Sequence, residues 1–294
     1  MGVLYILAIL LLRVVQNYCS KRSSQLFPVT MAGQIKYMAF LFTGSFILGL
    51  AAVLLGNASL RCDGLTLGLA AAAGATMVIA QLCMLLAMQS GSMVIVTAFS
   101  TAGLIVPCIT GMLFLGEKMS TWQWLGVALF ILASYLLGRS ARLQNERFGM
   151  KTVMLLLGAL LGNGATMLCQ KLLTYLRPDS SISAYSFYCF AIPALFFSLM
   201  ILPAGSKRNA ERINRKLYLL ITLLAAALFA MNLLVTKATL YVPSAVLFTV
   251  PNAGNNVIAA VIAAVWIKEK ITGYSLAGLI LSILSLVLVL GLAG

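Results

Sequence analysis

The sequence of 294 residues contains no histidine and only six acidic residues. Without histidine, a histidine-ligated metal site and a histidine proton relay are both excluded. Charged residues make up only 9% of the chain, whereas a soluble domain has about 25%. No polar stretch is long enough to form a large soluble domain. These absences exclude a soluble protein as the main body of the chain.

The few acids are also missing from the apolar segments. They are Asp63, Glu117, Glu146, Asp179, Glu211 and Glu269, and all of them fall in the connections. A proton-driven exporter of cations is expected to hold a carboxylate inside the membrane, where it titrates and attracts cations. Clustered acids and metal-ligand spacings are absent too, so we expect no metal, no cofactor and no catalytic site.

Hydrophobic residues account for 62% of the chain, and its mean hydropathy is +1.05. A hydrocarbon core about 30 Å thick takes about 20 helical residues, and a lone strand cannot satisfy its backbone in lipid. We therefore predict ten transmembrane helices, at roughly residues 3–19, 36–56, 65–88, 92–115, 122–138, 152–175, 182–202, 217–237, 242–267 and 272–292.

A charged turn between two apolar segments occurs twice in the chain. Gly116-Glu117-Lys118-Met119-Ser120 is matched 152 positions later by Lys268-Glu269-Lys270-Ile271-Thr272. At a spacing of 150 positions, Cys19-Ser20-Lys21 matches Cys169-Gln170-Lys171. Such self-similarity indicates an internal repeat. Each copy contains five helices, an odd number, so the two copies lie in the membrane with opposite orientation.

The predicted fold is therefore an all-α polytopic membrane protein with ten transmembrane helices, built as two inverted five-helix repeats. The first repeat spans residues 1–140, a polar basic linker spans residues 141–151, and the second repeat spans residues 152–294. Inverted repeats are typical of secondary transporters, whose substrate site lies near the midplane between the repeats.

The two turns, with the glycine-containing helices after them, resemble the EamA family of the drug/metabolite transporter superfamily. The stronger match is Gly116-Glu117-Lys118 followed by Gln123-Trp124-Leu125-Gly126. The second copy departs from it at Ile267-Lys268 and at Ala277, which precedes Gly278. The resemblance covers nearly the whole chain. It implies a ten-helix exporter or exchanger of small polar metabolites and does not name the substrate.

Basic residues are shared unevenly between the two sides of the predicted membrane domain. Fourteen fall in the odd-numbered connections and five in the even-numbered ones. The positive-inside rule then places the odd-numbered connections in the cytoplasm and both termini outside. The family resemblance implies termini inside, so the two arguments give opposite orientations. Membrane orientation accounts for the net charge of +14, and we expect no nucleic-acid partner.

Polar side chains within spanning helices are costly, so each needs a bonding partner or a ligand. Arg13, Gln16 and Asn17 share one face of the first helix, and Asn163, Thr166 and Gln170 share one face of the sixth. The candidate substrate-binding residues are Arg13, Gln16, Asn17, Gln81, Ser100, Asn163, Thr166, Asn232, Asn252, Asn255 and Asn256. Interhelical hydrogen bonding without a ligand is the alternative interpretation.

Two glycine-bearing patterns make further structural predictions. Pro251 and Gly254 weaken the middle of the ninth helix, which predicts a kinked segment that lines a cavity. Gly158-x-x-x-Gly162 and Gly64-x-x-x-Gly68 predict close helix packing, because glycine lets two backbones approach.

Arg13 lies well inside the first helix, where a guanidinium costs about 2.5–3.5 kcal/mol on insertion scales. Its planar fork of donors suits a carboxylate or a phosphate in two-point contact. We therefore expect Arg13 to bind the anionic group of a substrate. Snorkelling or purely structural hydrogen bonding is the alternative.

These observations predict an integral protein of the cell membrane, the plasma or inner membrane, that moves small anionic or zwitterionic metabolites by alternating access. A non-transporting sensor or assembly subunit remains as an alternative. A polytopic membrane enzyme has less support, because the sequence offers no activated nucleophile. The expected partners are a small-molecule substrate and membrane lipid, and both a monomer and a homodimer remain open.

Overall fold

The computed structural model describes residues 2–26, 30–55, 60–90, 93–116, 120–142, 150–204, 215–242, 244–262, 264–265 and 272–291. These residues form eleven α-helices and no strand. The helices are α1 (Gly2–Leu26), α2 (Met31–Leu55), α3 (Gly64–Ser90), α4 (Met93–Ala102), α5 (Ile105–Phe114), α6 (Thr121–Arg142), α7 (Met150–Leu176), α8 (Ile182–Ala204), α9 (Arg215–Ala238), α10 (Ser244–Ile262) and α11 (Gly273–Gly291).

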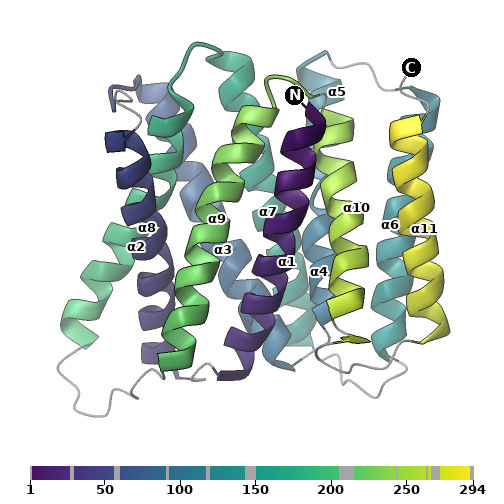
Figure 1. The fold of residues 1–294 in the computed structure, drawn as a ribbon, viewed down its shortest axis with the longest axis horizontal. Helices are drawn as coiled ribbons and strands as arrows, with labels where there is room; N and C mark the ends of the chain where they lie inside the picture. Colours follow the sequence, from purple (N-terminus) through teal and green to yellow (C-terminus); the bar gives the residue numbers. More distant parts are fainter. Residues whose placement is uncertain are drawn as a thin grey trace.

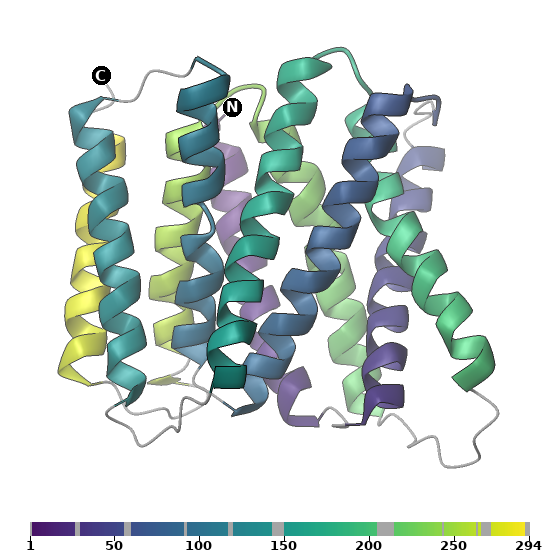
Figure 2. The same cartoon turned by 180° about the vertical axis from the view of Figure 1, so that it is seen from behind.

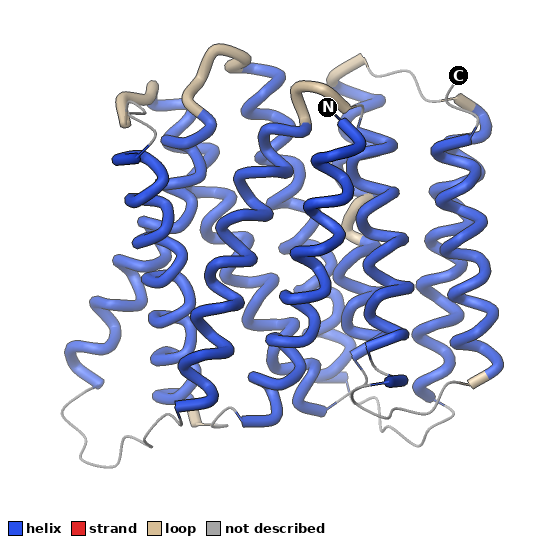
Figure 3. Tube along the Cα trace, viewed as in Figure 1, coloured by secondary structure: helices blue, strands red, loops and turns tan. Residues whose placement is uncertain are grey.

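Seven helical stretches are long and apolar enough to cross a membrane, with α4 and α5 together forming one of them. Three shorter apolar stretches lie within α6, α10 and α11. The chain is therefore an all-helical polytopic membrane protein. The helices stand side by side in one bundle, and tubes along the chain show that short connections join them at its two ends (Figure 3).

Both ends of the described chain lie at the same end of the bundle, where α1 begins and α11 ends (Figure 1). We call this the terminal end and the other the basic end. Lys21 and Arg22 lie within the last two turns of α1, which ends at the basic end, and Arg215 and Lys216 open α9 at the same end (Figure 1). The uneven charge seen in the sequence therefore corresponds to a difference between the two ends of the bundle.

Helices of residues 2–142 pack mainly on helices of residues 150–291. The most extensive contacts join α3 with α7, α6 with α11, α2 with α8, and α1 with α9. Figure 2 shows α3 and α7 side by side on the back of the bundle. Within lipid such contacts depend on close van der Waals packing and hydrogen bonds, because lipid tails are as apolar as the side chains themselves.

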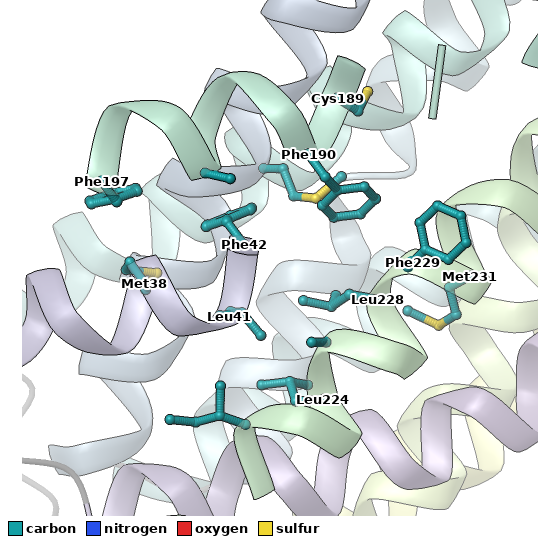
Figure 4. Packing of buried hydrophobic residues seen from close by; sticks show 14 of the residues in the cluster. Met38, Leu41, Phe42, Cys189, Phe190, Phe197, Leu224, Leu228, Phe229 and Met231 are labelled. Carbon is teal, nitrogen blue, oxygen red and sulfur yellow. The ribbon is translucent and has the colours of Figure 1, made fainter. Parts of the chain in front are cut away.

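The largest apolar core of the described residues is centred on α2, α8 and α9, with further residues from α1, α3 and α7, and Figure 4 shows the central part. Phe42 stacks on Phe197 with ring centroids 6.1 Å apart, and Phe190 meets Phe229 edge to face at 5.9 Å. Ser45 satisfies its hydroxyl within this apolar contact by donating to carbonyls of Leu41 and Ala225 at 3.0 and 3.1 Å. The core fixes α2 against the second half of the chain.

The fourth predicted helix is two helices, α4 and α5, separated at Gly103 and Leu104. Pro107 has no N–H to donate to the Gly103 carbonyl, which instead accepts from Val106 N at 3.0 Å. The ninth predicted helix, which was expected to be kinked at Pro251, is a single helix, α10, with Pro251 inside it.

One of the two glycine patterns makes the predicted contact. A Cβ on Gly162 would lie 2.8 Å from the Thr76 carbonyl, so this glycine holds α7 closely against α3. The prediction for Gly64 and Gly68 is wrong, since no other described atom lies within 4 Å of a Cβ built there.

Two predicted boundaries also shift. The first helix continues to Leu26 rather than ending near residue 19, and α6 enters the predicted linker as far as Arg142. The second half begins with α7 at Met150, and residues 143–149 of the linker lie outside the described residues.

An ion pair joins the two halves at the terminal end. Arg177, just after α7, donates from Nε to the Asp63 carboxylate at 2.8 Å. Asp63 also precedes α3 and accepts from the hydroxyl and the backbone N–H of Thr66, as a helix cap does. The Thr66 hydroxyl first, and then Arg177, hold the pKa of Asp63 at about 2, below its ordinary value of 3.8.

Candidate functional site

A cavity of about 70 Å³ lies among α1, α3, α7, α9 and α10. This volume has room for a few water molecules. Seven of the predicted substrate-binding residues line it, drawn from all five helices: Arg13, Gln16, Gln81, Asn163, Thr166, Asn232 and Asn252. Residues far apart in the sequence are therefore brought to one place, and most of their polar groups are neutral amides.

The face of α1 that carries Arg13 and Gln16 points inward because the opposite face is apolar. Leu4, Leu7 and Leu11 expose 67%, 53% and 70% of their surface, as expected for side chains that meet lipid. Gln16 is only 3% exposed. Spacings of three and four residues along α1 place the polar and apolar side chains on opposite faces.

The Arg13 guanidinium is held by neutral groups. Its Nη1 donates to Gln16 Oε1 at 3.0 Å, and its Nη2 donates to Asn252 Oδ1 at 3.4 Å. Its Nε is buried and has no hydrogen-bond partner among the described residues. No Asp or Glu lies within any of the eleven described helices, so these helices provide no carboxylate to pair with the Arg13 guanidinium.

Asn163 on α7 also makes a hydrogen bond to another helix. Its Nδ2 donates at 2.8 Å to the carbonyl of Ser100, which lies in the last turn of α4 before the break. The same carbonyl accepts from the Gly103 N–H at 3.3 Å, so Asn163 adds a second and shorter hydrogen bond beside the interruption. Ser100 takes part through its carbonyl, and its side chain is not among those that line the cavity.

Three other predicted residues form interhelical hydrogen bonds away from the cavity lining. Asn17 Nδ2 donates to Asn255 Oδ1 at 2.6 Å, and Asn256 Oδ1 accepts from the Thr101 hydroxyl at 2.9 Å. These bonds join α1 to α10 and α4 to α10. For Asn17, Asn255 and Asn256, as for Ser100, the geometry fits the structural alternative raised by the sequence.

Asn232 differs from the other cavity amides. It is 4% exposed, and neither its Oδ1 nor its Nδ2 has a hydrogen-bond partner among the described residues. Its backbone carbonyl, in contrast, accepts from the Thr236 hydroxyl at 2.7 Å. The free polar atoms therefore belong to the side chain, which lines the cavity.

Gln170, which the sequence places on the same face of the sixth helix as Asn163 and Thr166, lines the cavity with them. The sequence interpretation missed the apolar part of the lining, which includes Met77, Met167 and Met231. Nothing in their spacing separates them from other apolar residues of their helices. Their flexible thioethers add an adaptable apolar surface beside the amides.

Several lining residues are separated by about the spacing at which the sequence predicts an internal repeat. Arg13 and Asn163 are 150 positions apart, as are Gln16 and Thr166, and Gln81 and Asn232 are 151 apart. Arg13 bonds to Asn252, and Asn163 bonds to the carbonyl of Ser100, which precedes Asn252 by 152 positions. Residues at these spacings thus face the same cavity.

The site offers amides, hydroxyls, thioethers and one guanidinium. Within the described residues, no group of three or more His, Cys, Asp or Glu side chains is arranged to hold a metal ion. The chemistry that this set can perform is recognition: donors for an anion, mixed donors and acceptors for neutral polar groups, and contact with an apolar chain.

No protein family model matches this chain, and no curated protein matches it. A crystal structure of another protein aligns with a TM-score of 0.73 at 15% identity, over 99% of this chain and 97% of that one. The similarity therefore extends over the whole helical bundle. At this identity it shows a shared fold.

Proposed function

We propose that the protein is a secondary transporter that moves small anionic or zwitterionic metabolites across the cell membrane. The observation that carries this proposal is Arg13, a cation in a cavity at the middle of the bundle whose hydrogen bonds within the described residues all go to neutral amides. A buried cation without a countercharge favours binding of an anion.

The proposal includes the architecture of ten transmembrane helices in two inverted five-helix repeats of the EamA type. Under this scheme α1 to α3 correspond to α7 to α9, α4 with α5 corresponds to α10, and α6 corresponds to α11. The contacts support it, since α1 on α9 is mirrored by α7 on α3, and α1 on α10 by α7 on α4. The three repeat-related pairs that line one cavity support it further.

The size of the cavity supports alternating access as the mechanism. Small-molecule sites usually enclose about 300–1,000 Å³, several times the 70 Å³ found here. A metabolite therefore enters only when the surrounding helices separate. The helices that bound the cavity come from both halves of the chain, so a movement of one half against the other changes its volume.

Orientation follows from charge. The basic end of the bundle carries Lys21, Arg22, Arg215 and Lys216, and the positive-inside rule assigns this end to the cytoplasm. Both termini then lie outside. A sensor or an assembly subunit would have the same orientation, so the transport experiment decides between these functions.

The test is uptake of labelled amino acids, organic acids and sugar phosphates into proteoliposomes. For an anion that is transported, Arg13→Gln is expected to lower uptake at least tenfold and Arg13→Lys less, because lysine keeps the charge and loses the fork. Neutral analogues should be affected least. The control is Arg22→Gln, the same change on α1, where Arg22 donates to Gln25 away from the cavity.

Two results would refute the proposal. If no compound of the panel moves faster than in empty liposomes, the transporter assignment fails. If Arg13→Gln reduces transport of anionic and neutral compounds equally, Arg13 has a structural role and the anion preference fails.

A further inference from the structure

Asn232 is a cavity amide whose two side-chain polar atoms are both buried and both lack partners within the described residues. Gln16 and Asn252 each accept from Arg13, and Asn163 donates to Ser100. Asn232 lies on α9 and is 96% buried, with Oδ1 and Nδ2 both unbonded. A buried amide in this condition is unfavourable unless a ligand completes its hydrogen bonds.

The same cavity contains a second unbonded donor, the Nε of Arg13 on α1. A guanidinium has five N–H donors, and only two of those of Arg13 are seen to be used. The two unsatisfied groups differ in kind. Arg13 can only donate, whereas the Asn232 amide both donates and accepts. A ligand that completes both must therefore carry two different polar groups.

From this difference we infer that Asn232 selects the substrate: the ligand of this cavity carries an uncharged amide or hydroxyl group that bonds to Asn232, in addition to its anionic group. This inference rests on the proposed transport function and narrows its substrate class. A group that both donates and accepts satisfies Oδ1 and Nδ2 together. A second carboxylate would leave Oδ1 unbonded, and an ammonium group would leave Nδ2 unbonded.

The neighbours of Asn232 favour a short apolar link between the two polar groups. Met231 precedes it on α9, and Met77 and Met167 face the same cavity from α3 and α7. Thioether side chains make no demand for hydrogen bonds and adapt to the shape of a hydrocarbon chain. The substrate class is therefore an amide-bearing or hydroxyl-bearing carboxylate or phosphate.

The experiment compares succinamate with isocaproate, which replaces the amide by a branched alkyl group of similar shape, and with succinate, which replaces it by a carboxylate. Glutaramate, L-asparagine and L-glutamine extend the series of amide probes. Affinity is measured on the full-length protein in nanodiscs by ligand-induced thermal stabilisation, which increases with ligand concentration relative to Kd.

We expect the wild type to bind the preferred amide probe about tenfold more tightly than isocaproate, the effect of one buried hydrogen-bonding group left unpaired. Asn232→Leu should bring this ratio close to one. Asn232→Ser, which keeps a hydroxyl, should retain part of it. The matched control is Thr222→Val, because the Thr222 hydroxyl lies on the same helix as Asn232, outside the cavity lining, and is bonded to the Tyr218 carbonyl at 3.0 Å, so its loss should leave the ratio unchanged.

The outcomes separate this inference from the function on which it rests. If Asn232→Leu loses the amide preference, and Arg13→Gln weakens binding of succinamate and isocaproate equally, the inference about Asn232 and the anion-binding role of Arg13 are both supported. Absence of binding by every amide probe overturns the inference, as does an amide preference that survives in Asn232→Leu and Asn232→Ser. An amide preference that depends on Asn232 while Arg13→Gln binds normally keeps the inference about Asn232 and removes the anion role of Arg13.

Discussion

Replacing Gly164 by alanine tests how closely α7 must approach the break between α4 and α5. A Cβ on Gly164 would lie 2.6 Å from the Gly103 carbonyl oxygen and 2.8 Å from Val106 Cγ2. Ordinary van der Waals contact begins near 3.4 Å. The obstacle at Gly103 is backbone, so a change of side-chain rotamer cannot remove it. The two segments must separate by about 0.8 Å instead.

The expected loss of stability follows from these distances. Overpacking of this kind costs about 1–3 kcal/mol. Separation also weakens the neighbouring bond from Asn163 to the Ser100 carbonyl, now 2.8 Å, worth about 0.5–1.5 kcal/mol. Alanine returns about 1 kcal/mol through its better helix propensity. The net destabilisation is about 1–3 kcal/mol.

The matched control is Gly68→Ala on α3, where no other described atom lies within 4 Å of the new Cβ. Only the gain in helix propensity applies there, so this variant is expected to be up to about 1 kcal/mol more stable. The assay is thermal unfolding in nanodiscs, where a chain of this length shifts by about 2 °C per kcal/mol. Gly164→Ala should lower Tm by about 2–6 °C and Gly68→Ala should raise it slightly. Equal shifts in both variants would refute the argument from close backbone contact.

Three further predictions concern other parts of the molecule. Because the pKa of Asp63 is lowered from 3.8 to about 2, its ion pair with Arg177 should stabilise the protein above about pH 4 and lose this effect as the pH falls through about 2. The difference in Tm between the wild type and Asp63→Asn should follow this course, and a difference that disappears near neutral pH would contradict it. Cysteines introduced one at a time at position 142 and at position 212, which lies outside the described residues, should resist an impermeant maleimide on intact cells in a Cys62→Ser background. Ready labelling at both would reverse the orientation. Asn252→Leu removes a partner of Arg13 and should reduce transport more than it reduces membrane abundance, and transport at the wild-type rate would exclude Asn252 from the site. Asn255→Leu should instead lower Tm, because it leaves Asn17 unbonded.

The polar faces were predictable from the sequence because lipid imposes a strong rule. Arg13 and Gln16 on α1, and Asn163 and Thr166 on α7, had to face protein rather than hydrocarbon, and their spacing identified the face. The same rule does not tell which amide will find a partner on another helix. Asn17 meets Asn255 across 238 residues of sequence, and this pairing depends on the packing register of α1 and α10.

Local backbone features were less predictable, since one signal can have two outcomes. Pro251 and Pro107 both remove a helical hydrogen bond, yet only the segment with Pro107 is interrupted. The additional factor is Gly103, which lies against α7 where a side chain would not fit. The patterns at Gly158 and at Gly64 likewise share the Gly-x-x-x-Gly spacing, but only the pattern at Gly158 has another described helix packed against it.

The pairing of helices across the two halves also has a consequence for how the protein is made. Asn252 follows Arg13 by 239 residues, so at about 5–20 residues per second it is synthesised about 10–50 s later. During this interval the newly inserted α1, α2 and α3 lack the helices on which they pack most extensively. The cell must shield their polar faces until α7 to α10 enter the bilayer. A chain that stops in the connection after α6 would keep an arginine inside the membrane without its Asn252 partner, which makes such a fragment a natural substrate for membrane quality-control proteases.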